Sequence, residues 1–144
     1  MREDFCVFIL THGRPNNIKT IKTLERAGYT GKLYIVIDDE DETEDQYRKK
    51  YGDKVLKFCK NEIAKNIDSG DLSEDRRTIV YARNACFDLA KKVGCRYFIE
   101  LDDDYTSFEH RFIQGGKLRV SAVTAIDNIF SAMIEFLEKP PRKQ

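Results

Sequence analysis

The segment RYFIELDDDY, residues 96–105, limits the possible folds more than any other part of the chain. A short apolar and aromatic run follows Gly94 and stops at three consecutive carboxylates, Asp102, Asp103 and Asp104. This pattern is typical of a buried strand that brings charge to the edge of a sheet. Like charges about 4 Å apart repel by about 1–4 kcal/mol near a protein surface, and bound Mg²⁺ or Mn²⁺ would offset that repulsion. A solvated acidic turn is the alternative interpretation.

The length of the chain favours one domain over residues 1–144, large enough for a hydrophobic core. Charged residues make up 35% of the chain and their charges balance to zero, so no bulk electrostatic attraction to nucleic acid or anionic membrane is expected. No apolar run is long enough to cross a bilayer, and the acidic N-terminus does not look like a signal peptide. We therefore expect no membrane partner and a cytoplasmic location, in the host cytoplasm if a phage encodes the chain. The four cysteines form no CxxC pair and are expected to be reduced and mostly buried.

The first half of the chain predicts two buried strands, at residues 5–10 and 33–37, because both runs are apolar at nearly every position. A helix between them is expected to have Pro15 in its first turn, an inward face with Ile18, Ile21 and Leu24, and an end at Gly28. After the second strand, residues 43–46 (TEDQ) read as a capping box that opens a short helix ending at Gly52.

The second half predicts an outer strand at residues 55–59, then a mobile loop or active-site flap at residues 61–75. A helix over residues 76–93 leads into the strand before the aspartates. Gly115 and Gly116 then predict a β-hairpin. Ser121 is expected to cap a final amphipathic helix that ends before Pro140.

Alternation of strands and helices predicts an α/β fold with a mostly parallel, Rossmann-like central sheet flanked by helices, followed by the hairpin and the C-terminal helix. In a parallel sheet the carboxyl ends of all strands lie at one edge, where ligands bind. That edge should collect Thr11, His12 and Arg14, then Asp38 and Asp39, and the aspartate triplet.

These side chains point to a nucleotide-diphosphate ligand. A metal bridges phosphate oxygens and Arg14 adds bidentate hydrogen bonds. Carboxylates such as Asp38 and Asp39 can accept hydrogen bonds from a base N–H or a sugar hydroxyl. For single residues a purely structural role stays open: His12 as a loop histidine, Arg14 as a partner of the acidic strand ends, and Arg83 as a solvated helix residue.

The chain resembles nucleotide-sugar glycosyltransferases of the GT-A fold over residues 5–108. The resemblance rests on residues 11–15 (THGRP), 37–39 (IDD), 82–84 (ARN) and the DxD-like 101–104 (LDDD). It implies that Asp38 or Asp39 contacts the base or ribose, that Asp102 and Asp103 face the donor with Asp102 and Asp104 at the metal, and that Arg83 lies near the donor. The cofactor implied is Mn²⁺ or Mg²⁺, and the donor favoured is a UDP-sugar.

Within that class, residues 101–105 (LDDDY) with Phe108 and Arg111 are similar to phage and kinetoplastid glycosyltransferases that glucosylate hydroxymethylated pyrimidines in DNA. The acceptor implied is therefore a modified DNA base. GT-A enzymes usually continue well past the final helix, where acceptor contacts and the base of inverting members lie. The chain is thus interpreted as a minimal module, a piece of a longer protein, or an enzyme completed by a partner.

No catalytic base is assigned, although Glu100, Glu109 and His110 lie nearby in sequence. Two other functions stay open: nucleotidyl transfer, which usually uses a more Gly-rich loop than residues 11–14, and non-catalytic binding of a nucleotide sugar. If the apolar stripe over residues 123–137 is partly exposed, a homodimer through the C-terminal helix is expected.

Overall fold

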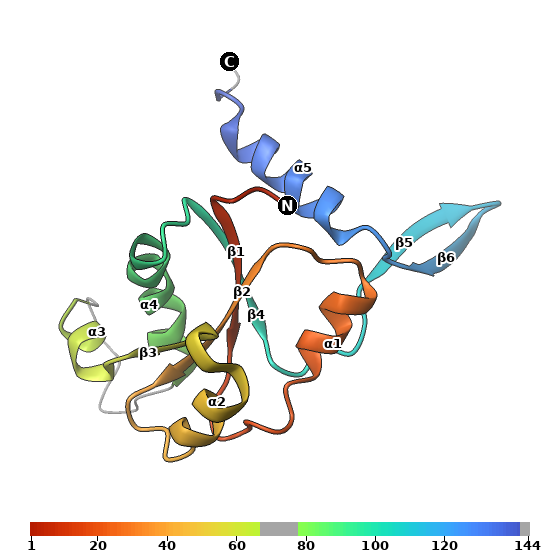
Figure 1. Ribbon diagram of the computed structural model, residues 1–144. Coiled ribbons are helices and arrows are strands. Elements are labelled where there is room, and N and C mark those ends of the chain that lie inside the picture. Colours follow the sequence, from red (N-terminus) through yellow and green to blue (C-terminus); the bar gives the residue numbers. More distant parts are fainter. Residues whose placement is uncertain (67–77, 142–144) are drawn as a thin grey trace.

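The computed structural model describes residues 1–66 and 78–141, and in these ranges the chain is an α/β protein (Figure 1). The strands are β1 (Phe5–Leu10), β2 (Lys32–Asp38), β3 (Val55–Phe58), β4 (Tyr97–Asp102), β5 (Glu109–Gln114) and β6 (Lys117–Ala122). The helices are α1 (Lys19–Arg26), α2 (Glu44–Tyr51), α3 (Lys60–Asn66), α4 (Thr78–Lys92) and α5 (Ile126–Glu138), with a short 3₁₀ turn, η1, at Gly52–Lys54.

The central sheet has four parallel strands in the order β3-β2-β1-β4, as the alternation of strands and helices predicted. Every residue of β1 is buried, because helices cover both faces of the sheet. Val7 and Ile9 belong to a core with α1, α2 and α5, whereas Cys6 and Phe8 belong to a core with α3 and α4. The period of two in β1 thus divides its side chains between two helical layers.

Several predicted details are wrong. The region expected to be a loop from residue 61 contains α3, whose first backbone N–H, that of Lys60, donates to the Asp39 carboxylate. Thr43 precedes α2 but does not cap it, because its hydroxyl donates to Asp41. Pro15 lies in the loop before α1 rather than in the helix. The rest of the predicted flap, residues 67–75, and the predicted start of α4 at residues 76 and 77 lie outside the described residues.

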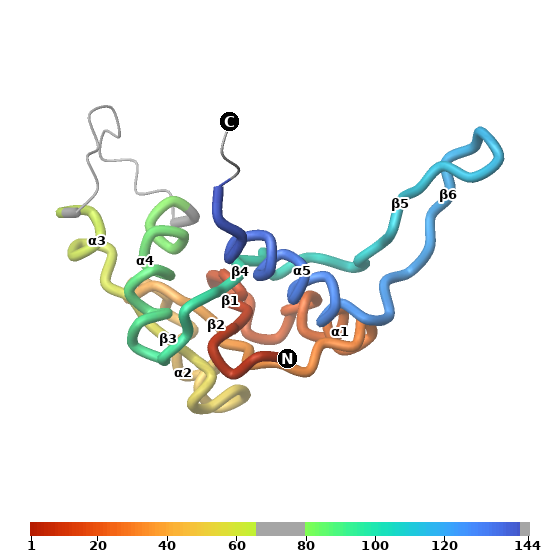
Figure 2. The backbone as a smooth tube through the Cα atoms, turned by 90° about the horizontal axis from the view of Figure 1, so that it is seen from above, coloured from red at the N-terminus to blue at the C-terminus, as the bar shows by residue number. Residues whose placement is uncertain are grey.

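The C-terminal part leaves the body of the domain as a hairpin and returns as a helix. Strands β5 and β6 pair antiparallel across Gly115 and Gly116, which both have positive φ, as the Gly-Gly step predicted. Figures 1 and 2 show this hairpin extending away from the central sheet. Ser121 lies within β6, so it does not cap α5; the residue before α5 is Ala125. Among the described residues, no helix is long and apolar enough to cross a membrane.

Candidate active site

The loop after β1 is bound to the end of β4 through Asp103. The Thr11 hydroxyl donates to Asp103 Oδ2 at 2.7 Å, and Arg14 Nη1 lies 3.4 Å from Asp103 Oδ1. The phenol of Tyr47, from α2, lies 2.9 Å from Thr11 Oγ1 and accepts the Arg14 backbone N–H. Asp103 is only 7% exposed. Both of its carboxylate oxygens contact this loop and fix its position.

The backbone at the end of β4 also holds the start of α1. The carbonyl of Asp103 accepts the backbone N–H groups of Lys19 and Thr20 at 2.9 and 3.3 Å. The Thr20 hydroxyl donates to the Asp102 carbonyl and accepts the Tyr105 N–H. Free N–H groups at the beginning of a helix need acceptors, and the end of β4 supplies them in place of a side-chain cap.

The end of β2 forms a second buried polar cluster, centred on Asp38. This side chain is fully buried: Oδ2 lies 2.7 Å from His12 Nδ1, and Oδ1 accepts the Glu40 N–H at 2.9 Å. The ammonium of Lys60 lies 3.6 Å from Asp38 Oδ1 and 3.1 Å from Glu40, with Lys60 only 5% exposed. The buried Asp38 carboxylate thus fixes the positions of His12, the Glu40 backbone and Lys60.

The two other aspartates after β2 have lowered pKa values. The pKa of Asp39 lies below its usual range because its carboxylate accepts the Lys60 backbone N–H. For Asp41, burial raises the pKa, but hydrogen bonds from the Thr43 hydroxyl and the Gly13 and Thr43 backbone N–H groups outweigh burial and lower it overall. Asp41 therefore holds the loop after β1 as a charged group, while Asp39 is exposed.

A pocket of about 210 Å³ opens where these strand ends meet. Its lining combines residues of the β1 loop, β4, β3 and α4: Leu10, Thr11, His12, Arg14, Phe58, Ala82, Asp102 and Asp103. The expectation that the ends of β1, β2 and β4 share one edge is confirmed, since Thr11 contacts Asp103 and His12 contacts Asp38. Polar side chains from separated parts of the sequence thus surround one pocket.

A scan against protein-family models matches residues 5–143 to the family described as TET-Associated Glycosyltransferase. The chain belongs to this family. It is therefore a glycosyltransferase, which favours glycosyl transfer over the alternatives of nucleotidyl transfer and passive binding. Searches of curated proteins and of solved structures each gave no match.

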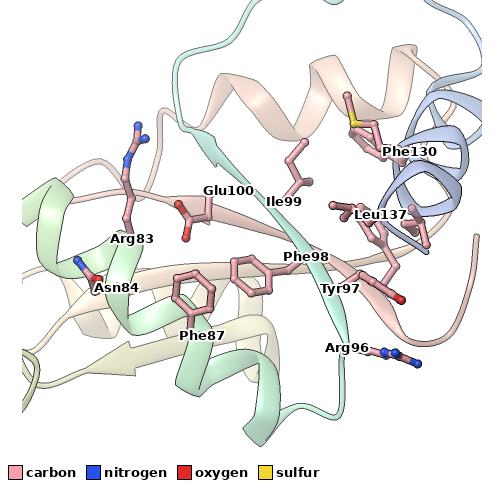
Figure 3. A pocket seen from close by; sticks show the side chains of 13 residues that line it. Arg83, Asn84, Phe87, Arg96, Tyr97, Phe98, Ile99, Glu100, Phe130 and Leu137 are labelled. Carbon is pink, nitrogen blue, oxygen red and sulfur yellow. The ribbon is translucent and has the colours of Figure 1, made fainter. Parts of the chain in front are cut away.

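Four predicted site residues of this TET-associated glycosyltransferase lie outside the pocket lining: Asp38, Asp39, Asp104 and Arg83. Asp104 is exposed and follows the pocket residue Asp103, and Asp39 is exposed next to buried Asp38. Arg83 lies on α4 and lines a separate groove along β4, together with Glu100 (Figure 3). The structure therefore gathers Thr11, His12, Arg14, Asp102 and Asp103 around the pocket, places Asp38 behind His12, and sets Arg83 apart.

The carboxylates near the pocket fit a metal ion shared with phosphates and water better than an ion held by protein side chains alone. Within residues 1–66 and 78–141, no three His, Cys, Asp or Glu side chains are grouped to hold an ion by themselves. The Asp103 oxygens are engaged by Thr11 and Arg14, which leaves the side chains of Asp102 and Asp104 as candidate ligands. A Mg²⁺ or Mn²⁺ ion that takes its other ligands from phosphates and water needs only one or two carboxylates, and these residues fit that case.

Sequence reasoning missed three residues of this edge: Asp41, Tyr47 and Lys60. Lys60 follows β3 directly, so the rule that places ligands at the carboxyl ends of parallel strands could have found it. Tyr47 has no such signal, because an aromatic residue in a helix is usually read as core. Its ring is fully buried, and its hydroxyl contacts Thr11 and the Arg14 backbone.

Proposed function

We propose that this glycosyltransferase takes its sugar from a nucleotide-diphosphate sugar, with UDP as the favoured nucleotide. The observation that supports this most directly is the pocket lined by Thr11, His12 and Arg14 of one strand end and Asp102 of another. A guanidinium, a hydroxyl and an imidazole suit phosphate oxygens, and a neighbouring carboxylate suits a cation bound to them. At about 210 Å³ the pocket accommodates the diphosphate, with the nucleoside extending across the open edge.

In this proposal Asp102 and Asp104 hold Mn²⁺ or Mg²⁺. The ion, when bound, neutralises charge that develops on the leaving diphosphate. Arg14, whose side chain is 57% exposed, contributes hydrogen-bond donors that Asp103 does not use. Asp103 acts indirectly, since it keeps Thr11 and Arg14 at the pocket. Asp38 acts in the same manner by orienting His12, while exposed Asp39 can reach the base or ribose.

We propose a modified pyrimidine base in DNA as the acceptor. The similarity of residues 101–111 to enzymes that glucosylate hydroxymethylated pyrimidines supports this acceptor, and so does the description of the matched family. Because the chain has zero net charge, attraction to DNA depends on local groups rather than on overall charge.

Isothermal titration tests the donor site. UDP is expected to bind with Mn²⁺ present and at least about tenfold more weakly with Asp104→Ala or Asp102→Asn, because each variant removes a carboxylate from the ion. Asp53→Asn is the matched control, since Asp53 is an exposed acid in η1, away from the pocket. Equal affinity for UDP with and without metal, unchanged by Asp104→Ala, contradicts the metal role.

Release of UDP from UDP-glucose tests the acceptor. We expect release to increase when duplex DNA containing hydroxymethylated pyrimidines is added and not when unmodified DNA is added. UDP binding without any such stimulation leaves the donor proposal in place and overturns the acceptor proposal, so the two can fail separately.

A further inference from the structure

The exposed apolar side chains of the described residues gather on two surfaces that do not touch each other. One is the hairpin, with Phe112, Ile113, Leu118 and Val120 exposed by 42–72%. The other is the outer side of β4, where α4 presents Phe87 and α5 presents Met133, Phe136 and Leu137, exposed by 50–75%. Two such surfaces on one small chain are unusual for a monomer and indicate an interface.

The second surface contains a groove along β4. In the described sheet β4 is the last strand and pairs only with β1, so its outer edge has unpaired backbone groups. A cavity of about 600 Å³ follows this edge between α4 and α5 (Figure 3). Its α5 side is apolar, with Phe130, Met133 and Leu137. On the side toward α4 lies Glu100 of β4, the single carboxylate of the lining, and two guanidinium groups also line the groove: Arg83 of α4 and Arg96, which stacks over the Tyr97 ring.

The hairpin has two unlike faces because opposite residues in an antiparallel pair point the same way. The first face has Leu118 opposite Ile113, and Val120 opposite Arg111. Arg119 opposite Phe112 and Lys117 opposite Gln114 lie on the second. Strand β6 therefore alternates between an apolar row and a basic row. All residues of β5 and β6 are exposed, although a free two-stranded hairpin is marginally stable in water.

We propose that the hairpin of a second copy of this chain fills the groove, with its β6 added to the free edge of β4. Both strands have six residues, so their lengths match. Leu118 and Val120 of β6 then pack on Met133 and Leu137 of α5. Lys117 and Arg119, on the other side of the added strand, face Glu100. Main-chain hydrogen bonds to a strand edge supply affinity, and the alternating side chains supply selectivity.

The arrangement closes with two copies. Figure 2 shows the hairpin extending to the side of the molecule where β4 is the outermost strand, so a two-fold axis beside that edge lets each copy insert its hairpin into the other. Glu100 supports the pairing, because burial raises its pKa and no other acid lines the groove. The Glu100 carboxylate already has a hydrogen bond with the Cys86 thiol and a favourable interaction with Arg83, which lower its pKa less than burial raises it. Figure 3 shows the guanidinium of Arg83 pointing away from Glu100, so a partner's cation would add to these interactions.

Sedimentation velocity on the full chain tests the proposal. We expect a dimer in the micromolar range, and dissociation constants at least about tenfold higher for Leu118→Glu and for Met133→Glu, because each places a charge in the apolar contact. The two single variants mixed together are expected to form a heterodimer, since one intact hairpin then meets one intact groove. Phe136→Glu is the matched control: Phe136 is exposed on α5, by 75% against 50% for Met133, but does not line the groove, so the dimer of this variant should be unchanged.

Circular dichroism melting checks that all three variants fold, which is expected because the three side chains are at least 50% exposed. A wild-type chain that stays monomeric overturns the proposal. So does a dimer that Phe136→Glu disrupts and Leu118→Glu does not, which would place the contact on the outer face of α5. A monomer whose duplex DNA binding is lost with Arg119→Glu assigns the hairpin to nucleic acid instead.

Discussion

The carboxyl edge of the sheet and the outer edge of β4 differ in the polarity and the burial of their side chains. At the carboxyl edge, charged side chains are buried and nearly all have partners: Asp103 with Thr11 and Arg14, Asp38 with His12 and Lys60. Along β4, apolar side chains are exposed and the strand edge is unpaired in the described chain. The polar groups of the first region thus have partners within the described chain, whereas the strand edge of the second region has none there.

The comparison shows that polarity does not by itself mark the flexible or interacting part of a protein. A buried polar cluster with all its hydrogen bonds made is rigid, and it can present a few unused groups to a ligand with little reorganisation. An exposed apolar edge gains more from a macromolecular partner, because burial of its area is the main favourable term in association. Substitutions in the two regions should therefore affect different quantities, namely unfolding at the first and association at the second.

The largest effect is expected for Asp38→Ala. It removes the carboxylate that contacts His12, the Glu40 N–H and buried Lys60. The free energy of unfolding should fall by about 3 kcal/mol, since three groups lose a partner while Lys60 keeps Glu40. Urea unfolding followed by circular dichroism measures this. Asp39→Ala is the control at the adjacent exposed position and should cost only about 1 kcal/mol, through the lost bond to the Lys60 N–H. Equal effects would contradict the contrast between buried and exposed aspartates.

A smaller loss is expected for Thr11→Val, which keeps the shape of the side chain and removes its hydroxyl. Asp103 Oδ2 and the Tyr47 phenol each lose a partner, at a cost of about 1–2 kcal/mol. Tyr47→Phe removes the other end of one of these bonds. The pair and the double variant form a thermodynamic cycle by urea unfolding, and additive effects would argue against a connected network.

A gain in stability is expected for Glu100→Gln when it is made in the monomeric Leu118→Glu background. Burial raises the pKa of Glu100, so the folded state binds its proton more tightly and the stability of the parent falls as pH rises through that pKa. Gln carries no charge and removes this cost, so the gain in the free energy of unfolding should be present at pH 7 and should shrink as pH falls. Thermal melting across pH measures it. In the dimeric wild type the gain should be smaller, because a partner's Arg119 then stabilises the charge.

The smallest effect is expected when residues 110–121 are replaced by a short Gly-containing turn. The side chains of β5 and β6 are exposed, so the unfolding free energy of the monomer should change by less than about 0.5 kcal/mol while dimerisation is lost. The backbone bond from Val123 to Phe108 closes the base of the hairpin and stays intact. Loss of the fold in this variant would show that the hairpin belongs to the core.

Much of the carboxyl edge could be predicted from sequence because the rule that governs it is topological. Once residues 5–10, 32–38 and 97–102 are recognised as parallel strands, their ends must lie at one edge, whatever the side chains do. What could not be predicted is which carboxylate is engaged. Asp103 and Asp104 look alike in sequence, yet Asp103 is buried against Thr11 while Asp104 is exposed.

Two of the wrong predictions share one cause, competition among neighbouring polar groups. Residues 43–46 match a capping box, but Asp41 lies close enough to take the Thr43 hydroxyl. Residues 61–66 are poor in apolar side chains and were predicted to lie in a loop, yet the Asp39 carboxylate accepts the first N–H, that of Lys60, of a helix there. Such outcomes depend on distances across the fold that spacing in sequence does not contain.

The hydrogen bond between Thr11 and Asp103 joins positions 92 residues apart. The backbone N–H groups of Lys19 and Thr20 likewise donate to the Asp103 carbonyl. During synthesis these groups have no partner until the chain past residue 103 has left the ribosome. The pocket at the carboxyl edge therefore cannot form before that point, and a nascent chain interrupted before residue 102 lacks part of its lining, however well its first helix and strands have folded.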